Sequence, residues 1–551
     1  MGKTQSVLEK KGYTIQKEME NGVIATDKDG DSFVIKEINL ETTDAEKIFS
    51  EIGPLLEINH PHIASYKNSF QDGNSYYVVM DHCEGGDLSQ KIRDRMETGI
   101  PFSEEQIMDW LVEICMAVKH VHDKGLLHRD LRPQNIFLTR FGTICLGNFG
   151  RVIKNVERSS ENGALAYLGP EILKGETYNT KSDIWSLGCV LYELCMLQSA
   201  FTAESTIKLT SKILDGVYPS LPESFLPELR ALLCYIFHQD PSIRPLAGEI
   251  LATPFIISFL TKKSEKTLKK LQTNLDNLRA LADGLERVHQ GTTIGSLAGG
   301  VIGAAGGITS IVGLILAPFT LGASLIVTGV GVGVAVAGGA TAGVSNITNM
   351  VNQSTDRKAI KNIIIEFQEK IKSLVTSIQV IAEGLETLRA SVSFDTGSDN
   401  STSENLSRVG ARIGRGLGAI PELVRLVQVA NIGRVVAQTA RAVRVAEVAT
   451  GIFSAFFVAV DLYFIAVDAK EIHNIRQAKA NRQSVDTSRL EVMDTDSTTG
   501  LNPEGEDPVA EPKPEVKSET MKFIQTIRQT ADQLQESLME LSDIIALIPK
   551  S

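Results

Sequence analysis

The first half of the chain combines two hydrophobic periods. Apolar and polar residues alternate along residues 32–40, SFVIKEINL, which predicts a strand that carries Lys36. A mainly apolar run in residues 75–88, SYYVVMDHCEGGDL, predicts a buried strand that ends near a glycine pair. A helical stripe follows, with apolar residues every three or four positions: Ile107, Trp110, Leu111, Ile114 and Val118. Strands followed by helices in this way are typical of an α+β domain.

The second half carries long stripes of helical spacing. Apolar residues three and four positions apart predict an amphipathic helix in each of three segments. The first stripe is Leu268, Leu271, Leu275, Leu278, Ala282 and Leu285; the second is Ile360, Ile364, Phe367, Ile371, Leu374, Ile378, Ile381, Leu385 and Leu388; the third is Ile524, Ile527, Ala531, Leu534, Leu538, Leu541, Ile545 and Ile548. We expect the third helix, over residues 519–549, to dock on the first two or on another copy of the chain.

A stretch without a single Asp, Glu, Lys or Arg lies between the first two stripes, from Val288 to Thr355. It is long enough for two membrane-spanning helices of about 20 residues each, and Pro318 stands near its middle, where a turn would be. Glycines recur four residues apart, a spacing that lets helices pack closely in lipid. The sequence therefore predicts an apolar hairpin over about 293–348 that inserts into membranes. The alternative is a buried hairpin in a soluble helical bundle.

Polar segments separate the helices of this half. Residues 393–407 predict a short flexible linker, and the acidic residues 483–518, rich in Pro and Gly, predict a disordered one. Between them, residues 408–482 predict a basic amphipathic helix and then an apolar helix. The arginines of the basic helix suit either anionic headgroups or an ordinary solvated face. Asp461 lies inside the apolar helix, which is therefore either a membrane segment with a functional acid or a packed core helix.

Composition narrows the partners and the compartment. A net charge of −12 argues against nucleic acid as the main partner, because binding to phosphates needs surplus Lys and Arg. The six cysteines form no CxxC pair, which is typical of reduced thiols inside the cell. The residues after Met1 predict no secretory signal, but MGKTQS matches the myristoylation pattern at Gly2. We expect residues 1–12 to be an N-terminal tail.

One pair of motifs carries chemistry. Residues 126–139 have the sequence LLHRDLRPQNIFLT and residues 146–151 have the sequence LGNFGR, which is the spacing of a kinase catalytic loop and its metal-binding Asp-Phe-Gly. Asn148 stands where that motif needs the aspartate. Lys36 occupies the strand position of the lysine that orients the nucleotide phosphates, and Glu51 follows at the distance expected for its helical partner.

The runs FVIKEIN, VMDHCEGGDL, HRDLRPQNIFLT and KSDIWSLGCVLYELC resemble the NIMA-related serine/threonine protein kinases over residues 13–260. The resemblance implies a bilobal kinase fold with ATP and magnesium as cofactors. It assigns each role to a matching residue: the phosphate-orienting ion pair to Lys36 and Glu51, the border of the adenine to Met80 and Cys83, the catalytic base to Asp130 with Arg132 beside it, the metal ligands to Asn135 and Asn148, the buried ion pair of the larger lobe to Glu171 and Arg244, and the brace of the catalytic loop to Asp183.

Four departures from the kinase pattern argue against efficient phosphate transfer. Asn148 offers a neutral amide oxygen to a cation that prefers carboxylates. The segment YTIQKEMENGVIATD holds only Gly22 where a phosphate-covering loop needs three glycines. Arg132 replaces a lysine, and Ala164 replaces a threonine. We therefore predict a pseudokinase or a weakly active kinase that binds ATP and magnesium weakly. The alternative is an active enzyme that tolerates Asn148.

The segments LQTNLDNLRALADGLERVHQGTTIGSLAGG and VGLILAPFTLGASLIVTGVGVG are similar to the apolipoprotein L family, over about residues 262–480. This resemblance implies binding to membranes and lipids. With no secretory signal in the sequence, we expect the protein to be intracellular and membrane-associated. The expected partners are membrane lipids, protein substrates or regulators, and a second copy bound through the long helices.

The sequence thus predicts an α+β bilobal protein-kinase fold followed by an all-α, partly membrane-spanning or membrane-inserting helical region. The first part of this helical region comprises residues 261–392. In this hypothesis the kinase-like part regulates the apolar part. Two rivals stay open, a membrane-targeted active Ser/Thr kinase and a soluble scaffold without membrane contact. Ser159 and Ser160, in the loop before Gly163, are candidate phosphosites, and the alternative is that they are plain solvated serines.

Overall fold

The computed structural model describes residues 2–19, 22–28, 30–40, 45–149, 162–295, 342–394, 432–491 and 514–548. These residues form two compact units. The first unit contains Met1–Ser264, Val375–Thr439 and Ile545–Ser551, and the second contains Glu265–Leu374 and Ala440–Ile544.

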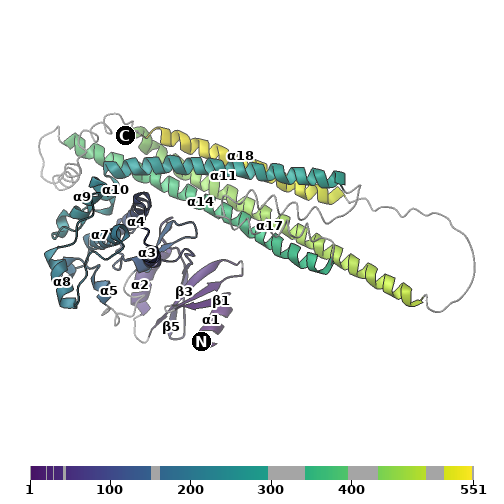
Figure 1. The fold of residues 1–551 in the computed structure, drawn as a ribbon, viewed down its shortest axis with the longest axis horizontal. Coiled ribbons are helices and arrows are strands. Elements are labelled where there is room, and N and C mark those ends of the chain that lie inside the picture. The colour runs from purple at the N-terminus through teal and green to yellow at the C-terminus, as the bar shows by residue number, and fades with distance from the viewer. Residues whose placement is uncertain are drawn as a thin grey trace, which may run out of the picture. The chain divides into compact units, whose positions relative to one another are not determined.

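A five-stranded antiparallel sheet opens the first unit (Figure 1). Its strands are β1 (Thr14–Met19), β2 (Gly22–Thr26), β3 (Ser32–Asn39), β4 (Tyr66–Asp72) and β5 (Ser75–Asp81), in the order β1-β2-β3-β5-β4. Helix α2 (Ala45–Leu56) connects β3 to β4. Both strands predicted from the alternating and the apolar run are present as β3 and β5, and they pair with Lys36 opposite Val78. Because side chains alternate between the faces of a strand, Lys36 and Ile35 lie on opposite faces of the sheet.

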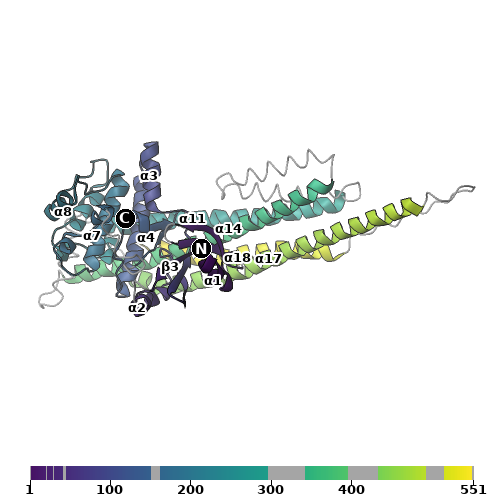
Figure 2. The ribbon, with the colours of Figure 1, turned by 90° about the horizontal axis from the view of Figure 1, so that it is seen from below.

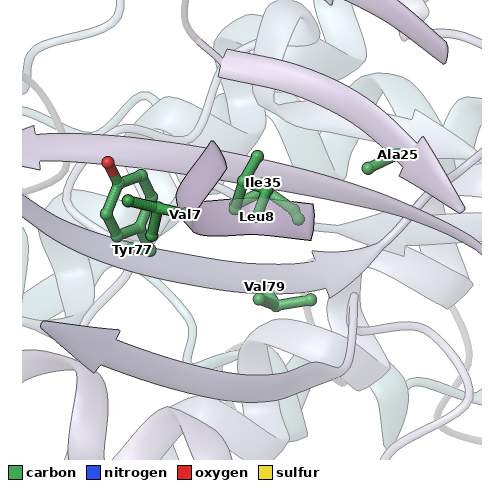
Figure 3. Packing of buried hydrophobic residues seen from close by; sticks show 6 residues of the cluster. All are labelled: Val7, Leu8, Ala25, Ile35, Tyr77 and Val79. Atoms are coloured by element: carbon green, nitrogen blue, oxygen red, sulfur yellow. The ribbon is translucent and has the colours of Figure 1, made fainter. Parts of the chain in front are cut away.

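The first residues of the chain form a helix, α1 (Gly2–Lys10), in place of the predicted tail. Val7 and Leu8 of this helix are buried against Ile35, Tyr77 and Val79 of the sheet (Figure 3). The sheet face that carries Ile35 would otherwise expose this apolar surface to water, and its burial stabilises the docked helix. Two adjacent apolar residues are too short a pattern to predict a docked helix, which is why we expected a tail.

The larger part of the first unit is helical. Its elements are α3 (Leu88–Thr98), α4 (Glu104–Asp123), η1 (Pro133–Asn135), β6 (Ile136–Leu138), β7 (Ile144–Leu146), α5 (Asn162–Leu165), α6 (Pro170–Leu173), α7 (Thr180–Met196), α8 (Thr206–Asp215), α9 (Pro227–Ile236), η3 (Pro241–Ile243) and α10 (Ala247–Leu251). All five residues of the predicted apolar stripe in α4 are buried. Helix α7 is also buried along most of its length, so these two helices form the centre of the lobe.

Four long helices follow: α11 (Pro254–Gly295), α14 (Ala342–Phe394), α17 (Ile432–Glu491) and α18 (Pro514–Ala546). In the second unit they run alongside one another in both views (Figures 1 and 2). Arg279 of α11 lies 3.1 Å from Asp532 of α18, and Arg441 of α17 lies 2.9 Å from Glu540 of α18. Helix α18 therefore packs on other helices of its own chain. This is the first of the two arrangements that we predicted from its apolar stripe.

The predicted stripes are the buried faces of these helices. All eight stripe residues of the C-terminal helix are buried, as are Leu271, Leu275, Ala282 and Leu285 of α11 and every stripe residue of α14 from Ile364 to Leu388. Two boundaries differ from the prediction. Helix α17 continues through residues 484–491 and α18 begins at Pro514, although both segments were expected to be disordered. Proline suits the first turn of a helix because the missing N–H has no partner there.

Helix α17 buries one face and exposes another that is also apolar. Phe453 and Phe456 are 2% and 1% exposed, whereas Val458 and Leu462 on the opposite side are 58% and 62% exposed. By length and composition only, residues 433–466 and 241–287 are candidate membrane spans among the described residues, which is weak evidence by itself. Asp461 pairs with Lys361 of α14 at 2.9 Å. The core of the predicted hairpin, residues 296–341, lies outside the described residues.

Candidate active site of the kinase-like domain

The catalytic loop is held by one buried carboxylate. Asp183 of α7 accepts hydrogen bonds from the backbone N–H groups of His128 and Arg129, both at 2.9 Å. It also accepts the Tyr178 hydroxyl proton at 2.6 Å and lies 2.9 Å from Nε2 of His122. Burial alone would raise the pKa of Asp183, but these hydrogen bonds and the neighbouring histidines lower it overall. The predicted brace is therefore in place, and it holds Arg129 in a left-handed conformation with φ 66°.

Asp130, the predicted catalytic base, is held by the residue predicted to bind metal. Nδ2 of Asn135 donates to the backbone oxygen of Asp130 at 2.6 Å and to its carboxylate Oδ2 at 2.8 Å. Arg132 lies on the other side of the carboxylate, with Nε 3.3 Å from Oδ1. Asp130 and Arg132 are each about one-fifth exposed, so the base stays accessible to solvent. The structure brings these three residues together as predicted.

Asn148 connects the two lobes of the site. Its Oδ1 accepts a hydrogen bond from Nζ of Lys36, which comes from strand β3, and its Nδ2 donates to Oδ1 of Asn135 at 3.0 Å. Asn148 has a left-handed backbone with φ 59°, a conformation that asparagine tolerates better than most residues. A continuous chain of hydrogen bonds therefore runs from Lys36 through Asn148 and Asn135 to Asp130.

Phe149, next to Asn148, is packed inside the domain. It is 2% exposed, and its ring centroid lies 4.7 Å from that of His128 and 6.4 Å from that of Tyr66. His128 in turn lies with Nε2 3.0 Å from the backbone oxygen of Gly147. These tilted and edge-to-face ring contacts hold the backbone next to Asn148, so the position of its amide is set by the fold.

Two of the oxygen atoms that would face a magnesium ion at this site belong to the neutral amides of Asn135 and Asn148. Magnesium requires oxygen ligands and favours carboxylates. Here the amide oxygens of Asn148 and Asn135 already accept hydrogen bonds from Lys36 and from Asn148. An ammonium group and an amide N–H therefore point at the atoms that would have to face the cation. Among the described residues, no cluster of three His, Cys, Asp or Glu side chains offers another metal site.

The segment predicted to cover the phosphates contains strands β1 and β2, which pair as an antiparallel hairpin. Strands β1 and β2 pair with Met19 opposite Gly22, so only two residues connect them. Gly22 has φ +143°, and a Cβ atom on it would lie 2.5 Å from the backbone oxygen of Ile35 in β3. The one glycine of this segment therefore permits close strand packing.

The predicted ion pair of the larger lobe is present and fully buried. Nη1 and Nη2 of Arg244 donate to the two carboxylate oxygens of Glu171 at 2.9 and 2.8 Å, and the guanidinium lies over the ring of Trp185 at 4.8 Å. Ser182 adds a hydrogen bond to Glu171 at 2.7 Å. Burial raises the pKa of Glu171, but the bonds from Arg244 and Ser182 lower it overall.

The remaining predicted site residues have mixed outcomes. Met80 is buried at 4% exposure in β5, and Cys83 follows the strand half-buried. Gly2 begins helix α1. Glu51 lies in helix α2, but its side chain is outside the described residues, so its ion pair with Lys36 stays a prediction. Ser159 and Ser160 also lie outside the described residues.

Sequence reasoning missed a buried polar cluster behind the catalytic loop. Glu113 of α4 accepts a hydrogen bond from the backbone N–H of Ile144 at 2.9 Å, and Nζ of Lys263 of α11 lies 2.8 Å from it. Lys263 also pairs with Asp109 at 3.0 Å. His62 is fully buried 3.9 Å from Glu113. The signal was a glutamate inside the apolar stripe of α4, at a position where a buried charge requires a partner.

Comparison with known proteins places this site in a family. Residues 22–256 match the family model of the protein kinase domain. Mouse serine/threonine-protein kinase Nek1 is 44% identical over 247 residues, which cover 44% of this chain and 20% of the relative. Human Nek5 is 40% identical over 237 residues, covering 42% of this chain and 33% of the relative. The N-terminal part of this chain therefore contains a protein kinase domain that is similar to the Nek serine/threonine-protein kinases.

The segment after the kinase match is similar to a second family. Residues 257–484 match the model of apolipoprotein L, and this match begins directly after the kinase match ends.

A further relative matches the kinase part. Mouse Nek4 is 37% identical over 262 residues, or 45% of this chain and 33% of the relative. The chain therefore spans only about a fifth to a third of the length of these curated relatives. The kinase match begins at Gly22, after the segment where a glycine-rich loop would stand.

Proposed function

We propose that this protein is a pseudokinase or weakly active kinase whose NIMA-related domain regulates a lipid-binding apolipoprotein L region. One observation carries the first part. Asn148 stands in the position of the metal-binding aspartate, and its amide is tied to Lys36 and Asn135. A metal ion that bridges the phosphates is what neutralises the charge developing in phosphate transfer. Weak magnesium binding at this position would therefore slow transfer of the γ-phosphate.

The sequence of the hairpin between β1 and β2 supports the same proposal. With Gly22 as the one glycine of residues 13–27, side chains such as Met19 hinder a close approach of the backbone N–H groups to phosphates. Arg132, beside Asp130, replaces the compact lysine charge with a planar group. Weak binding of ATP and magnesium follows from these features together.

The regulatory part of the proposal has a physical route in the first unit. Helix α11 begins in the kinase-like unit, where Ile257 and Leu260 are buried and Lys263 pairs with Asp109 and Glu113. Ile257 and Leu260 already belong to the apolipoprotein L match. Glu113 also accepts a hydrogen bond from the strand that leads to Asn148. A change of structure at Asn148 is therefore transmitted to α11 through this strand, Glu113 and Lys263.

Membrane association is the second part of this proposal. Its support is the apolipoprotein L match and the exposed apolar face of α17, where Val448, Val458, Leu462 and Ile465 are each more than half exposed. Exposed apolar surface of this extent on a helix is typical of an interaction site. Membrane lipids are the partner that we propose for it, inside the cell.

A phosphate-transfer assay tests the first part. Purified full-length protein is incubated with labelled ATP, magnesium and a general protein substrate, alongside Asn148→Asp and Asp130→Ala. We expect background transfer from the wild type and a gain of at least about tenfold in Asn148→Asp, because the carboxylate restores a metal ligand. Robust wild-type transfer that disappears in Asp130→Ala would support the rival, a membrane-targeted active Ser/Thr kinase. That rival is favoured by the intact placement of Asp130 against Asn135.

A further inference from the structure

Helix α14 enters the kinase-like unit at Val375. Its residues belong to the apolipoprotein L match, whereas residues 22–256 of the same unit are the kinase match. A helix of the second family is therefore packed into the unit that carries the catalytic loop.

Gly384 marks a close contact between α14 and the larger lobe. It is the one glycine between Val344 and Phe394, and a glycine inside a helix is less favourable than alanine. A Cβ atom on Gly384 would lie 3.2 Å from Cδ1 of Ile257 and 3.3 Å from Cα of Ala252. Both distances are shorter than an ordinary carbon contact of about 3.5–4.0 Å. The glycine is therefore explained by the close approach of α14 to the end of α10 and the start of α11.

An ion pair beside this glycine fixes which residues of α14 face the lobe. Nζ of Lys119, near the end of α4, lies 3.1 Å from Oε2 of Glu383. The lysine stem runs past α10, because a Cβ atom on Gly248 would lie 3.4 Å from Cε of Lys119. The Glu383 side chain is 58% exposed, so the pair adds little affinity and mainly sets the register of the helix.

Three buried apolar residues share the face of α14 that carries Gly384. Val380 and Ile381 lie four and three residues before the glycine and Leu388 lies four residues after it, which places them on one side of a helix. Ile381 is fully buried, and the other two are each 8% exposed. Undocking of α14 would uncover this side, and lipid would bury it again. The undocked form therefore binds lipid better than the docked form.

We infer that the surface formed by the end of α4, α10 and the start of α11 is a docking site for residues 380–388 of α14, and that this contact restrains membrane binding by the apolipoprotein L region. The inference rests on the proposed function, in which that region binds lipid, and it adds the contact through which the kinase-like domain acts. Helices α11 and α14 lead into and out of the charge-free stretch from Val288 to Thr355. The docking site holds both helices at one lobe, since Ile257 of α11 lies against Gly384 of α14.

A wedge at Gly384 tests the docking. Gly384→Leu adds a side chain where Ile257 and Ala252 leave no room, and Thr387→Leu is the matched control because Thr387 is exposed on the same helix. Hydrogen–deuterium exchange of the full-length proteins is measured by mass spectrometry in peptides that cover residues 247–260. We expect at least about fivefold faster exchange in Gly384→Leu, because the undocked helix no longer covers these amides. Thr387→Leu should exchange like the wild type.

Vesicle flotation tests the restraint. At a limiting concentration of phosphatidylcholine–phosphatidylserine vesicles, at least about threefold more Gly384→Leu than wild-type protein should bind, since lipid prefers the undocked form. Lys119→Glu is a milder variant that should raise both exchange and binding. Adding Glu383→Lys should reverse both increases, because it restores an ion pair of opposite polarity. This charge reversal decides if Gly384→Leu fails to fold, as judged by circular dichroism.

Three results overturn the inference. Unchanged exchange of residues 247–260 in Gly384→Leu and Lys119→Glu would show that α14 does not dock there. Faster exchange without more vesicle binding would show that the contact only supports the fold. Failure of the wild type and of every variant to bind vesicles would overturn the restraint together with the lipid-binding part of the proposed function, whereas the exchange data would still report on docking.

Discussion

Single residues in this protein show how one atom can change the meaning of a motif. Asn148 differs from aspartate by an amide group in place of a carboxylate oxygen, and its Nδ2 donates a hydrogen bond to Asn135. Gly22 shows the reverse case. It looks like the remnant of a phosphate-binding loop, but the backbone of Ile35 leaves no room for a Cβ atom there. Its glycine is therefore explained by strand packing.

Replacing Gly22 with alanine should destabilise the kinase-like unit by about 2 kcal/mol or more, because the new Cβ meets a backbone oxygen at 2.5 Å in a conformation with φ +143°. Gly53→Ala is the matched control. Gly53 lies in α2 with no atom within 4 Å of an added Cβ, and alanine there should stabilise by up to about 1 kcal/mol. Urea unfolding followed by tryptophan fluorescence measures both, since Trp110 and Trp185 lie in this unit. Equal midpoints would contradict this account of Gly22.

His62 should make stability depend on pH. Burial, and after it the charge of Lys263, lowers the pKa of His62 from 6.5 to about 3. Between pH 6.5 and 3 the unfolded chain binds a proton that the folded chain does not. The free energy of unfolding should therefore fall as the pH drops below 6.5, by up to about 1.4 kcal/mol per pH unit. His62→Leu should show a shallower fall over pH 7 to 4; parallel curves would refute the assignment.

At the scale of elements, helix α11 connects the segment that matches the protein kinase domain to the segment that matches apolipoprotein L. Its residues to Ser264 belong to the first unit and the following ones to the second. Lys263 lies where this helix meets α4, and the charges of Glu113 and Asp109 raise its pKa although burial acts in the opposite direction. Because the lysine is 19% exposed and Glu113 is 9% exposed, the pair is shielded from water. We interpret it as the anchor of α11.

Lys263→Met should destabilise the kinase-like unit by about 2–4 kcal/mol, since it leaves two partly buried carboxylates without their cation. Lys262→Met is the control, because Lys262 is exposed on the same helix. Chemical denaturation monitored by the fluorescence of Trp110, the neighbour of Asp109, measures the difference. If both variants unfold at the same denaturant concentration, the ion pair does not anchor α11.

At the scale of the whole molecule, a kinase domain and a helical region each have their own core. In the second unit, α17 uses one face for the core, through Phe453 and Phe456, and leaves a second apolar face outside. A helix that is apolar all round is more usual inside a membrane or a large core. The exposed face is therefore the surface through which we expect this unit to meet lipid.

The double variant Val458→Glu with Leu462→Glu should lose at least about tenfold in binding to anionic vesicles, because each apolar side chain contributes about 1.5–3 kcal/mol when it leaves water. Both side chains are more than half exposed, so the bundle should fold normally. Met539→Glu on α18, at 59% exposure, is the matched control. Vesicle flotation measures binding, and circular dichroism checks the helices. Undiminished flotation of the double variant would leave the soluble scaffold as the better hypothesis.

The sequence determined a large part of this picture because local patterns were strong. The alternation of apolar and polar residues around Lys36 predicted strand β3, and the apolar stripe of α4 predicted that helix. The catalytic motifs placed Asp130 and Asn135 in one loop. The long stripes predicted the buried faces of α14 and α18, since a helix that must bury one side has to repeat every three or four residues.

Only the tertiary structure decided the rest, because those features depend on residues far apart in the chain. The bond between Lys36 and Asn148 joins residues 112 positions apart, and no local pattern fixes the direction of an amide. The docking of α1 depended on an open face of the sheet, and the burial of Glu113 depended on Lys263 arriving from another helix. Local periodicity encodes which face is buried, whereas the partner of each polar group is settled only when distant segments meet.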